Sequence, residues 1–301
     1  MANLQTLSLP KYYRKALKNK VINTIFGLVL QVVPCFYFLI GTANAQPYFD
    51  LAGVQYWNSP ASVHPDSVGE QSFTASLSVP INVAPRFKLI FSPAYEQRLE
   101  SGPGLEKPWK LESLALPLNF VFYASDSTRM LSVTAINRFN GYSQLLVDDG
   151  WQLGAAVVGS KRFGQKLWLR LGVYYNNEFF GAYMLPLAGC DWLISDSWRM
   201  FGLLPSNMRL QHRITERFNA GVFFRSPVSS FRKPNGGYVK QYDNQLFLYA
   251  DFRLVSRWVI VAELGHSAFR TIWNRNQIGE EVLKSDGPIF KCGLFYRIPQ
   301  P

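Results

Sequence analysis

Few residues of this chain have both the side chains and the spacing that catalysis requires. Of its three histidines, His64, His212 and His266, only His266 stands among residues of catalytic type, in the run Glu-Leu-Gly-His-Ser over 263–267. A serine nucleophile needs an imidazole within hydrogen-bond reach. Adjacent residues of a β-strand point to opposite faces, so His266 and Ser267 cannot exchange a proton without a partner from another strand. We therefore predict no catalytic residue.

Other groups that could bind a metal ion or form a disulfide are scattered along the chain. Adjacent carboxylates occur at Asp148-Asp149 and at Glu280-Glu281, both in predicted loops. They could bind divalent cations at a lipopolysaccharide surface, but solvated loop charge is the preferred interpretation. Cys190 and Cys292 lie far apart in predicted strands, where they could pair in an oxidising compartment or remain free thiols. No spacing matches a metal site, and we predict no metal and no cofactor.

The first 45 residues have the character of an export signal. Residues 11–20 are strongly basic, residues 21–41 are almost wholly apolar, and Ala43-Asn44-Ala45 has the small-x-small pattern of a signal peptidase site. Polar and helix-breaking residues interrupt the apolar run, which argues against an uncleaved anchor. We predict a signal peptide over 1–45 that is cleaved after Ala45.

The remaining chain, residues 46–301, reads as one domain. It contains no run of about 18 consecutive apolar residues, so the sequence predicts no transmembrane helix there. The leader holds five of the 31 Lys and Arg residues and none of the 20 acidic ones, which leaves 26 basic against 20 acidic residues. No basic block of five or six residues remains, so we do not expect nucleic-acid binding.

Apolar and polar residues alternate through most of this domain. Residues 71–83 give the clearest strand, with Phe73, Leu77 and Ile81 on one face and small polar residues on the other. Similar alternation predicts strands through 87–98, 110–123, 130–139, 150–160, 167–176, 182–194, 198–213, 218–226, 241–254, 258–270 and 287–298. The predicted fold class is all-β, an antiparallel transmembrane β-barrel of about 12–14 strands. The predicted lumen-lining residues are Ser72, Thr74, Ser76, Ser78, Asn119 and Asn137.

The connections between the predicted strands alternate in length. Long connections are expected at 58–69, 99–109, 140–149, 226–240 and 271–286, and short ones at 84–86, 124–129, 161–166 and 255–257. Long loops at one rim and short turns at the other are typical of outer-membrane barrels, whose short turns face the periplasm. The strand number depends on 198–213. A tight turn at Pro205-Ser206-Asn207 gives about fourteen strands, and a looser fold of this region gives twelve.

The tryptophans lie at predicted strand ends. Barrels in membranes place amphipathic aromatic rings at the two lipid–water interfaces, where the ring contacts lipid and the N–H contacts water. The predicted interface residues are Trp57, Trp109, Trp151, Trp168, Trp192, Trp198, Trp258 and Trp273. Basic residues gather near the short turns, where they could contact lipid phosphates or simply form a solvated rim.

Residues 291–298 of the last predicted strand resemble the C-terminal insertion signal of outer-membrane barrels. In that signal Gly293, Tyr296 and Ile298 would engage the barrel-assembly machinery, although Ile298 stands where the family often has Phe and three residues follow it. The whole domain also resembles an uncharacterised barrel family of Bacteroidetes, a domain of unknown function. That resemblance rests on the leader, the strand rhythm and the segment from Trp198 through Leu204-Pro205 to Arg209. It implies a Gram-negative outer-membrane location in contact with lipid and brings no known activity.

We expect a passive channel or small-solute transporter, because a barrel of this size can be wider than its side chains fill. The alternative is a plugged structural or adhesive barrel that acts through its outer loops. It predicts charged side chains that meet across the lumen, for example Lys88, Glu96 and Arg98. A lipid-modifying enzyme centred on His266 is less favoured. A soluble periplasmic β-protein is the main alternative on fold.

Overall fold

The structure is a computed structural model that describes residues 48–61, 67–234, 236–276 and 279–299. The predicted leader and its cleavage after Ala45 lie outside the described residues. Among the described residues, no helix has the length and apolar character needed to cross a bilayer.

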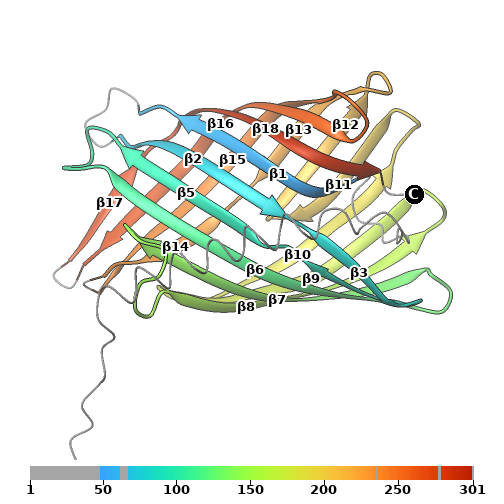
Figure 1. Cartoon of the computed structure of the whole chain (residues 1–301), viewed down its shortest axis with the longest axis horizontal. Helices are drawn as coiled ribbons and strands as arrows, with labels where there is room; N and C mark the ends of the chain where they lie inside the picture. Colours follow the sequence, from blue (N-terminus) through green and yellow to red (C-terminus); the bar gives the residue numbers. More distant parts are fainter. Residues whose placement is uncertain (1–47, 62–66, 235, 277–278, 300–301) are drawn as a thin grey trace, which may run out of the picture. The chain divides into compact units, whose positions relative to one another are not determined.

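All the regular elements of the described residues are β-strands (Figure 1). In chain order they are β1 (Tyr48–Ser59), β2 (Gly69–Leu77), β3 (Val79–Ala84), β4 (Phe87–Phe91), β5 (Ala94–Ser101), β6 (Trp109–Tyr123), β7 (Arg129–Tyr142), β8 (Trp151–Phe163), β9 (Leu167–Glu178), β10 (Gly181–Leu193), β11 (Trp198–Leu204), β12 (Asn207–Arg213), β13 (Phe218–Arg225), β14 (Val228–Arg232), β15 (Tyr238–Arg253), β16 (Trp258–Arg275), β17 (Glu280–Lys284) and β18 (Gly287–Pro299).

These strands form fourteen wall strands of one closed antiparallel barrel. Four wall strands are interrupted once, between β2 and β3, β4 and β5, β13 and β14, and β17 and β18. Pro93 and Pro227 lie in two of these breaks, where a residue without an N–H cannot continue the ladder. Pairing of β1 with both β2 and β18 closes the ring. The predicted antiparallel barrel is therefore confirmed, at the upper end of the predicted strand number.

The segment that left the strand number open forms two short strands. β11 and β12 pair antiparallel from Trp198↔His212 to Leu203↔Asn207, and Pro205-Ser206 turns between them. The tight turn that favoured fourteen strands is thus present.

The two ends of the barrel differ. We call the end with the connections 85–86, 124–128 and 164–166 the turn end, and the end with the connections 60–68, 102–108 and 143–150 the loop end. Two of the predicted long loops are wrong. Residues 226–240 contain β14 and the start of β15. Residues 271–286 contain the end of β16 and all of β17. In both segments the alternation of apolar and polar residues continues, so the strands extend farther toward the loop end. The wall is therefore tall at β15 and β16 and low at β11 and β12.

The barrel is polar inside and apolar outside. On β9, Leu171 is 71% exposed whereas the neighbouring Arg170 is 6% exposed. On β15, Leu248 is 64% exposed whereas Phe247 is 1% exposed. Because side chains alternate across a strand, the exposed row faces outward and the buried row faces the lumen. The packed core of this fold therefore lies in the lumen.

Candidate functional site: the interior of the barrel

The predicted lumen-lining residues divide between the two faces. Ser72, Thr74 and Ser76 alternate with the 45%-exposed Phe73 and so face inward, and the Ser72 hydroxyl donates to Glu96 Oε1 at 3.2 Å. Asn119 also faces inward and accepts a 2.7 Å hydrogen bond from Ser132. Ser78 lies at the break between β2 and β3, where its N–H donates to the Leu51 carbonyl.

Asn137 is the exception among these residues. It is paired in register with Leu116 on β6 and with Leu153 on β8, and Leu153 is 48% exposed on the outer face. The inward row of β7 is instead the even-numbered one, which includes the buried Asn140. The prediction for Asn137 is therefore wrong, because an asparagine among apolar residues does not by itself reveal the phase of the strand.

The tryptophans also divide. The outward-facing ones, all at wall-strand ends as predicted, are Trp151, Trp192, Trp198, Trp258 and Trp273. Trp57 and Trp109 are each 6% exposed and belong to two separate apolar clusters inside the lumen, and Trp168 faces inward beside Arg162 at 5.8 Å. For these three, the prediction of a membrane-interface position is wrong, because a strand-end position does not determine which face the ring occupies.

The middle of the lumen holds a lattice of charged and amide side chains. Arg98 on β5 makes a 2.8 Å contact with Glu96 on its own strand and donates to Gln241 Oε1 on β15 at 2.7 Å. Gln241 in turn donates to Glu100, and Arg270 on β16 pairs with Glu70 on β2. β15 and β16 are several wall strands away from β5 and β2, so these contacts span the lumen.

Lys88, Glu96 and Arg98 do not meet across the lumen as the plugged alternative predicts. Glu96 and Arg98 are paired, but along the single strand β5, and Lys88 faces the lumen from β4 near the turn end, at 5.5 Å from the Tyr123 ring. The charged pairs across the lumen come mainly from residues that the sequence analysis did not select. They include Glu70, Arg270, Arg209 and Glu263.

A second layer of ion pairs lies nearer the turn end. The Arg297 guanidinium contacts Asp50 at 2.6 Å and Asp251 at 2.5 Å, and lies 3.5 Å from the centre of the Tyr48 ring. Arg209 reaches Glu263 at 3.1 Å and the Tyr48 hydroxyl at 3.2 Å. Arg297 and Arg209 therefore each have a carboxylate partner, which a low-dielectric interior requires.

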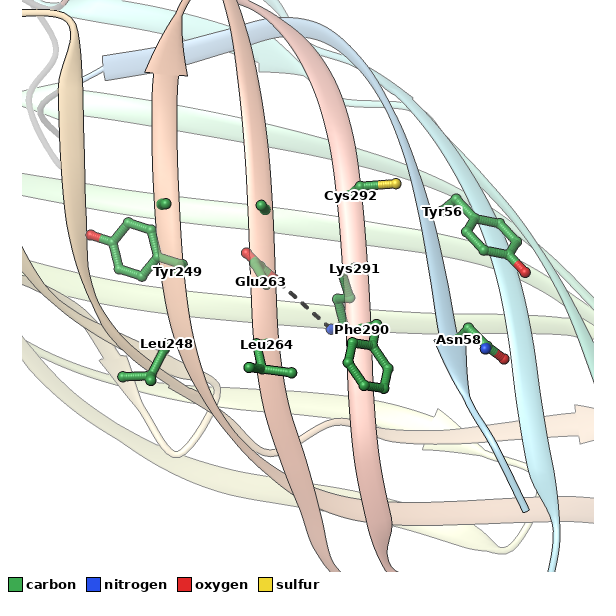
Figure 2. Close-up of a pocket in the computed structure, with 11 residues that line it drawn as sticks. Tyr56, Asn58, Leu248, Tyr249, Glu263, Leu264, Phe290, Lys291 and Cys292 are labelled. Atoms are coloured by element: carbon green, nitrogen blue, oxygen red, sulfur yellow. Dashed lines mark ion pairs between the residues drawn. The ribbon is translucent and has the colours of Figure 1, made fainter. Parts of the chain in front are cut away.

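Aromatic rings fill the space between these cations. Lys291 Nζ lies 4.3 Å from the centre of the Trp57 ring and 4.2 Å from that of Phe247. It also makes a 4.0 Å ion pair with Glu263. Figure 2 shows Glu263 and Lys291 joined between β16 and β18, with Leu264 and Phe290 at the adjoining positions of the same strands. Successive side chains of these strands thus point alternately into the lumen and to the outer surface.

An apolar cluster, which we call the roof cluster, lies inside the barrel at its loop end. Its buried members are Val68, Trp109, Leu111, Phe231, Val239, Ile272 and Leu283. They come from β6, β14, β15, β16, β17 and the β1–β2 connection, on both sides of the barrel. β12 begins at Asn207, which pairs with Arg225, the last residue of β13. β14 therefore has no partner on β12 and lies instead beside β7, with Arg232 paired to Gly141.

Ser230 on β14 fastens this strand to the opposite wall. Its hydroxyl donates to Glu178 Oε2 at 2.6 Å and accepts from Gln152 Nε2 at 2.9 Å and from the Phe179 N–H at 3.1 Å. Its carbonyl accepts from Asn140 Nδ2 at 2.9 Å. Glu178 also accepts a hydrogen bond from Gln152 and contacts Arg138, so its buried negative charge has both hydrogen-bond donors and a cation beside it. We call β14 together with these contacts the β14 latch.

The lumen is less filled along β2, β6 and β7. Thr74, Asn119, Ser132 and Thr134 face inward yet keep partial exposure. The inward residues of β15 from Val239 to Asp251 are buried, as at Gln245, which is 1% exposed. The lumen is therefore packed along β15, β16 and β18 and lined by partly exposed polar groups along β2, β6 and β7.

The remaining sequence candidates lie outside this arrangement. His266 is exposed on the outer face of β16, whereas Ser267 is fully buried and donates to Asp243 Oδ1 at 2.5 Å, so the expected opposite orientation is confirmed. Cys190 is a buried free thiol and Cys292 an exposed one. Among the described residues, no group of three His, Cys, Asp or Glu side chains could hold a metal ion.

Three further candidates have specific neighbours. Glu280 and Glu281 begin β17 rather than lying in a loop, and Glu281 accepts from Asn274 at 2.9 Å. In the predicted insertion signal, Tyr296 packs edge-on against Trp258 at 5.3 Å. Gly293 lies under the Phe295 ring, where a Cβ atom would be only 2.6 Å from that ring.

No protein-family model matches this chain, and no curated protein matches it. Among solved structures, an outer-membrane channel from Pseudomonas putida F1 is similar, with 9% sequence identity over 85% of this chain and 97% of that chain and a TM-score of 0.51. The NanC porin aligns with 8% identity over 82% of this chain and 100% of that one, at a TM-score of 0.41. The translocator domain of the autotransporter NalP from Neisseria meningitidis aligns with 12% identity over 95% and 99% of the two chains, also at 0.41. At these identities the likeness concerns the fold, which is that of an outer-membrane β-barrel.

Proposed function

We propose that this protein is an outer-membrane channel for small polar solutes, held closed at its loop end by the β14 latch. The observation that carries the proposal is the contrast within the lumen. Partly exposed hydroxyl and amide groups line it along β2, β6 and β7, whereas the roof cluster lies at its loop end. A fourteen-strand barrel is wide enough to leave space that its own side chains do not fill.

The outer surface supports the membrane location. Exposed leucines, valines and aromatic rings cover the outer face of β8, β9, β15 and β18, among them Leu171, Leu248 and Phe290. Soluble monomers rarely expose apolar patches beyond a few hundred Å². The outward tryptophans at wall-strand ends, such as Trp151 and Trp258, suit the two lipid interfaces. The export leader and the insertion signal at Gly293, Tyr296 and Ile298 agree with assembly by the barrel machinery into the outer membrane.

The lumen chemistry favours uncharged or zwitterionic solutes. Its cations and carboxylates occur as close pairs, for example Arg297 with Asp50 and Asp251 and Arg199 with Asp191. Paired charges present little net field to an ion, whereas the partly exposed hydroxyls of Thr74 and Thr134 can replace the hydration of a polar solute.

Opening would require β14 to leave β7. β14 is only five residues long, it follows the break at Ser226-Pro227, and it is paired with β7 at Arg232 and Gly141. It can therefore swing as a unit with less loss of wall hydrogen bonds than any full-length wall strand.

The second candidate is a structural or adhesive barrel that never opens. The cross-lumen contacts of Arg98 with Gln241 and of Arg270 with Glu70 favour it, because they tie opposite walls together. In that case the loop-end residues would carry the function.

Planar-bilayer recordings and liposome solute uptake distinguish these two functions. Residues 228–232 are replaced by a Gly/Ser segment of equal length, and residues 144–148 of the β7–β8 loop are replaced in the same way as a matched control. The channel predicts that the folded β14 replacement conducts and admits small solutes more than the control does. Equal, negligible flux through both folded barrels would establish the plugged alternative.

A further inference from the structure

A shallow depression lies on the outer face of the barrel near the turn end. It has a volume of about 690 Å³ and extends over β6, β7, β8 and β9. Its outward lining is apolar in the middle, where Phe122, Leu131, Gly159 and Leu171 stand in one row across four paired strands. Leu131 and Leu171 are 43% and 71% exposed, so this row faces outward.

Gly159 leaves the depression open, although neither packing nor backbone conformation requires a glycine at this position. A Cβ atom at this position would meet only the Leu171 carbonyl oxygen, at 3.8 Å, which is an ordinary contact distance. The backbone there does not adopt the left-handed conformation that favours glycine. The space above Gly159 is thus open to a ligand from outside.

Two cations border the apolar row on the side nearest the turns. Arg129 and Lys161 are paired in register on β7 and β8 and both are exposed. Lys161 Nζ lies 5.0 Å above the Phe163 ring, which holds the ammonium group at the edge of the depression. Among the described residues, no carboxylate lies within ion-pair distance of either cation, and Asp126 in the adjacent turn interacts with Arg129 only at longer range.

We propose that this depression binds one anionic glycerophospholipid, with an acyl chain over Gly159 and the phosphate between Arg129 and Lys161. The open space over Gly159, between the exposed side chains of Leu131 and Leu171, fits a single acyl chain, and two adjacent like charges are stabilised by a shared anion. The choice of a glycerophospholipid over a lipopolysaccharide rests on the proposed orientation, in which the turn end faces the periplasmic leaflet.

The test is a titration of phosphatidylglycerol onto the delipidated, detergent-solubilised protein, followed by native mass spectrometry. Each Lys or Arg near a lipid surface contributes about 1 kcal/mol, so Arg129→Gln with Lys161→Gln is expected to weaken binding about 30-fold. Gly159→Phe fills the depression and is expected to abolish the tight site. The matched control, Arg217→Gln with Arg253→Gln, removes two exposed cations at other turns and is expected to bind as the unchanged protein does.

Circular dichroism confirms that each variant is folded. Loss of affinity in the two site variants, but not in the control, supports the site. Unchanged binding in either site variant overturns it, and so does an equal loss in the control pair. Tighter binding of purified lipid A than of phosphatidylglycerol would overturn the choice of lipid. The binding measurement does not depend on conductance. A failure of the lipid site therefore leaves the proposed channel function unaffected, and a failure of the channel function leaves the lipid site unaffected.

Discussion

Removing one hydroxyl from the β14 latch is the most informative perturbation of the proposed closure. Ser230→Ala deletes the 2.6 Å hydrogen bond to Glu178 and the acceptor for the Phe179 N–H. Gln152 keeps its 2.8 Å bond to Glu178, so its amide stays satisfied. A hydrogen bond to a charged group contributes about 1.5–3 kcal/mol.

We take about 2 kcal/mol as the loss of closed-state stability, since water can solvate part of the released carboxylate. This corresponds to about a 30-fold fall in the ratio of closed to open channels. Single-channel recordings measure that ratio directly, as the open probability of the reconstituted protein. We expect the closed dwell times to shorten while the conductance of the open state stays the same.

Ser160→Ala is the matched control. Ser160 is a buried, inward-facing serine of β8, the strand that carries Gln152, but its hydroxyl has no hydrogen-bond partner among the described residues. Its removal should leave the open probability unchanged. A second variant, Phe231→Ala, removes a fully buried ring from the roof cluster and should also favour opening. An open probability in Ser230→Ala equal to that in Ser160→Ala would refute the latch.

Three other predictions follow from separate parts of the barrel. Arg297→Gln leaves Asp50 and Asp251 without their cation and should lower the free energy of unfolding by about 3–5 kcal/mol in urea titrations. If the free energy of unfolding fell no more than it does on replacement of an exposed arginine, the buried ion pairs of Arg297 would be contradicted. The Thr128 hydroxyl and N–H donate to Asp126 and lower the pKa of that carboxyl, so this contact is present at neutral pH and is lost as the pH falls through the lowered pKa. Thr128→Val should raise the pKa of Asp126 in an NMR titration, and an unchanged midpoint would exclude the contact. Cys292 faces outward, so in the protein reconstituted in liposomes a charged maleimide should label it only after denaturation. Rapid labelling of the folded protein in liposomes would show that Cys292 is in contact with water rather than lipid.

The fold could be predicted because its signal is repeated in every strand. The period-two alternation through 71–83 is long enough to fix both the strand and its phase, and Phe73 indeed faces outward. The short turn at Pro205-Ser206 was readable from local turn chemistry. Where the alternation weakens, as around Asn137, the phase was lost and the residue was assigned to the wrong face.

The contacts inside the lumen could not be predicted, because they join residues far apart in the chain. Ser230 and Glu178 are ordinary strand-end residues in the sequence, and only the ring closure brings them together. Trp57 and Trp109 have the same strand-end position as Trp258, but they belong to interior clusters. The decisive quantity is the shear of the barrel, which sets the residues that meet across the lumen and which local patterns do not encode.

The account depends most on lipid covering the outer face while the polar side chains lie in the lumen. Flotation of the refolded chain of residues 46–301 tests this directly, with and without phospholipid vesicles present during refolding. We expect the protein to float with the vesicles after a high-salt wash, to gain its β-sheet signal only there, and to precipitate in plain buffer. A monodisperse, folded particle in buffer without lipid or detergent would contradict the account.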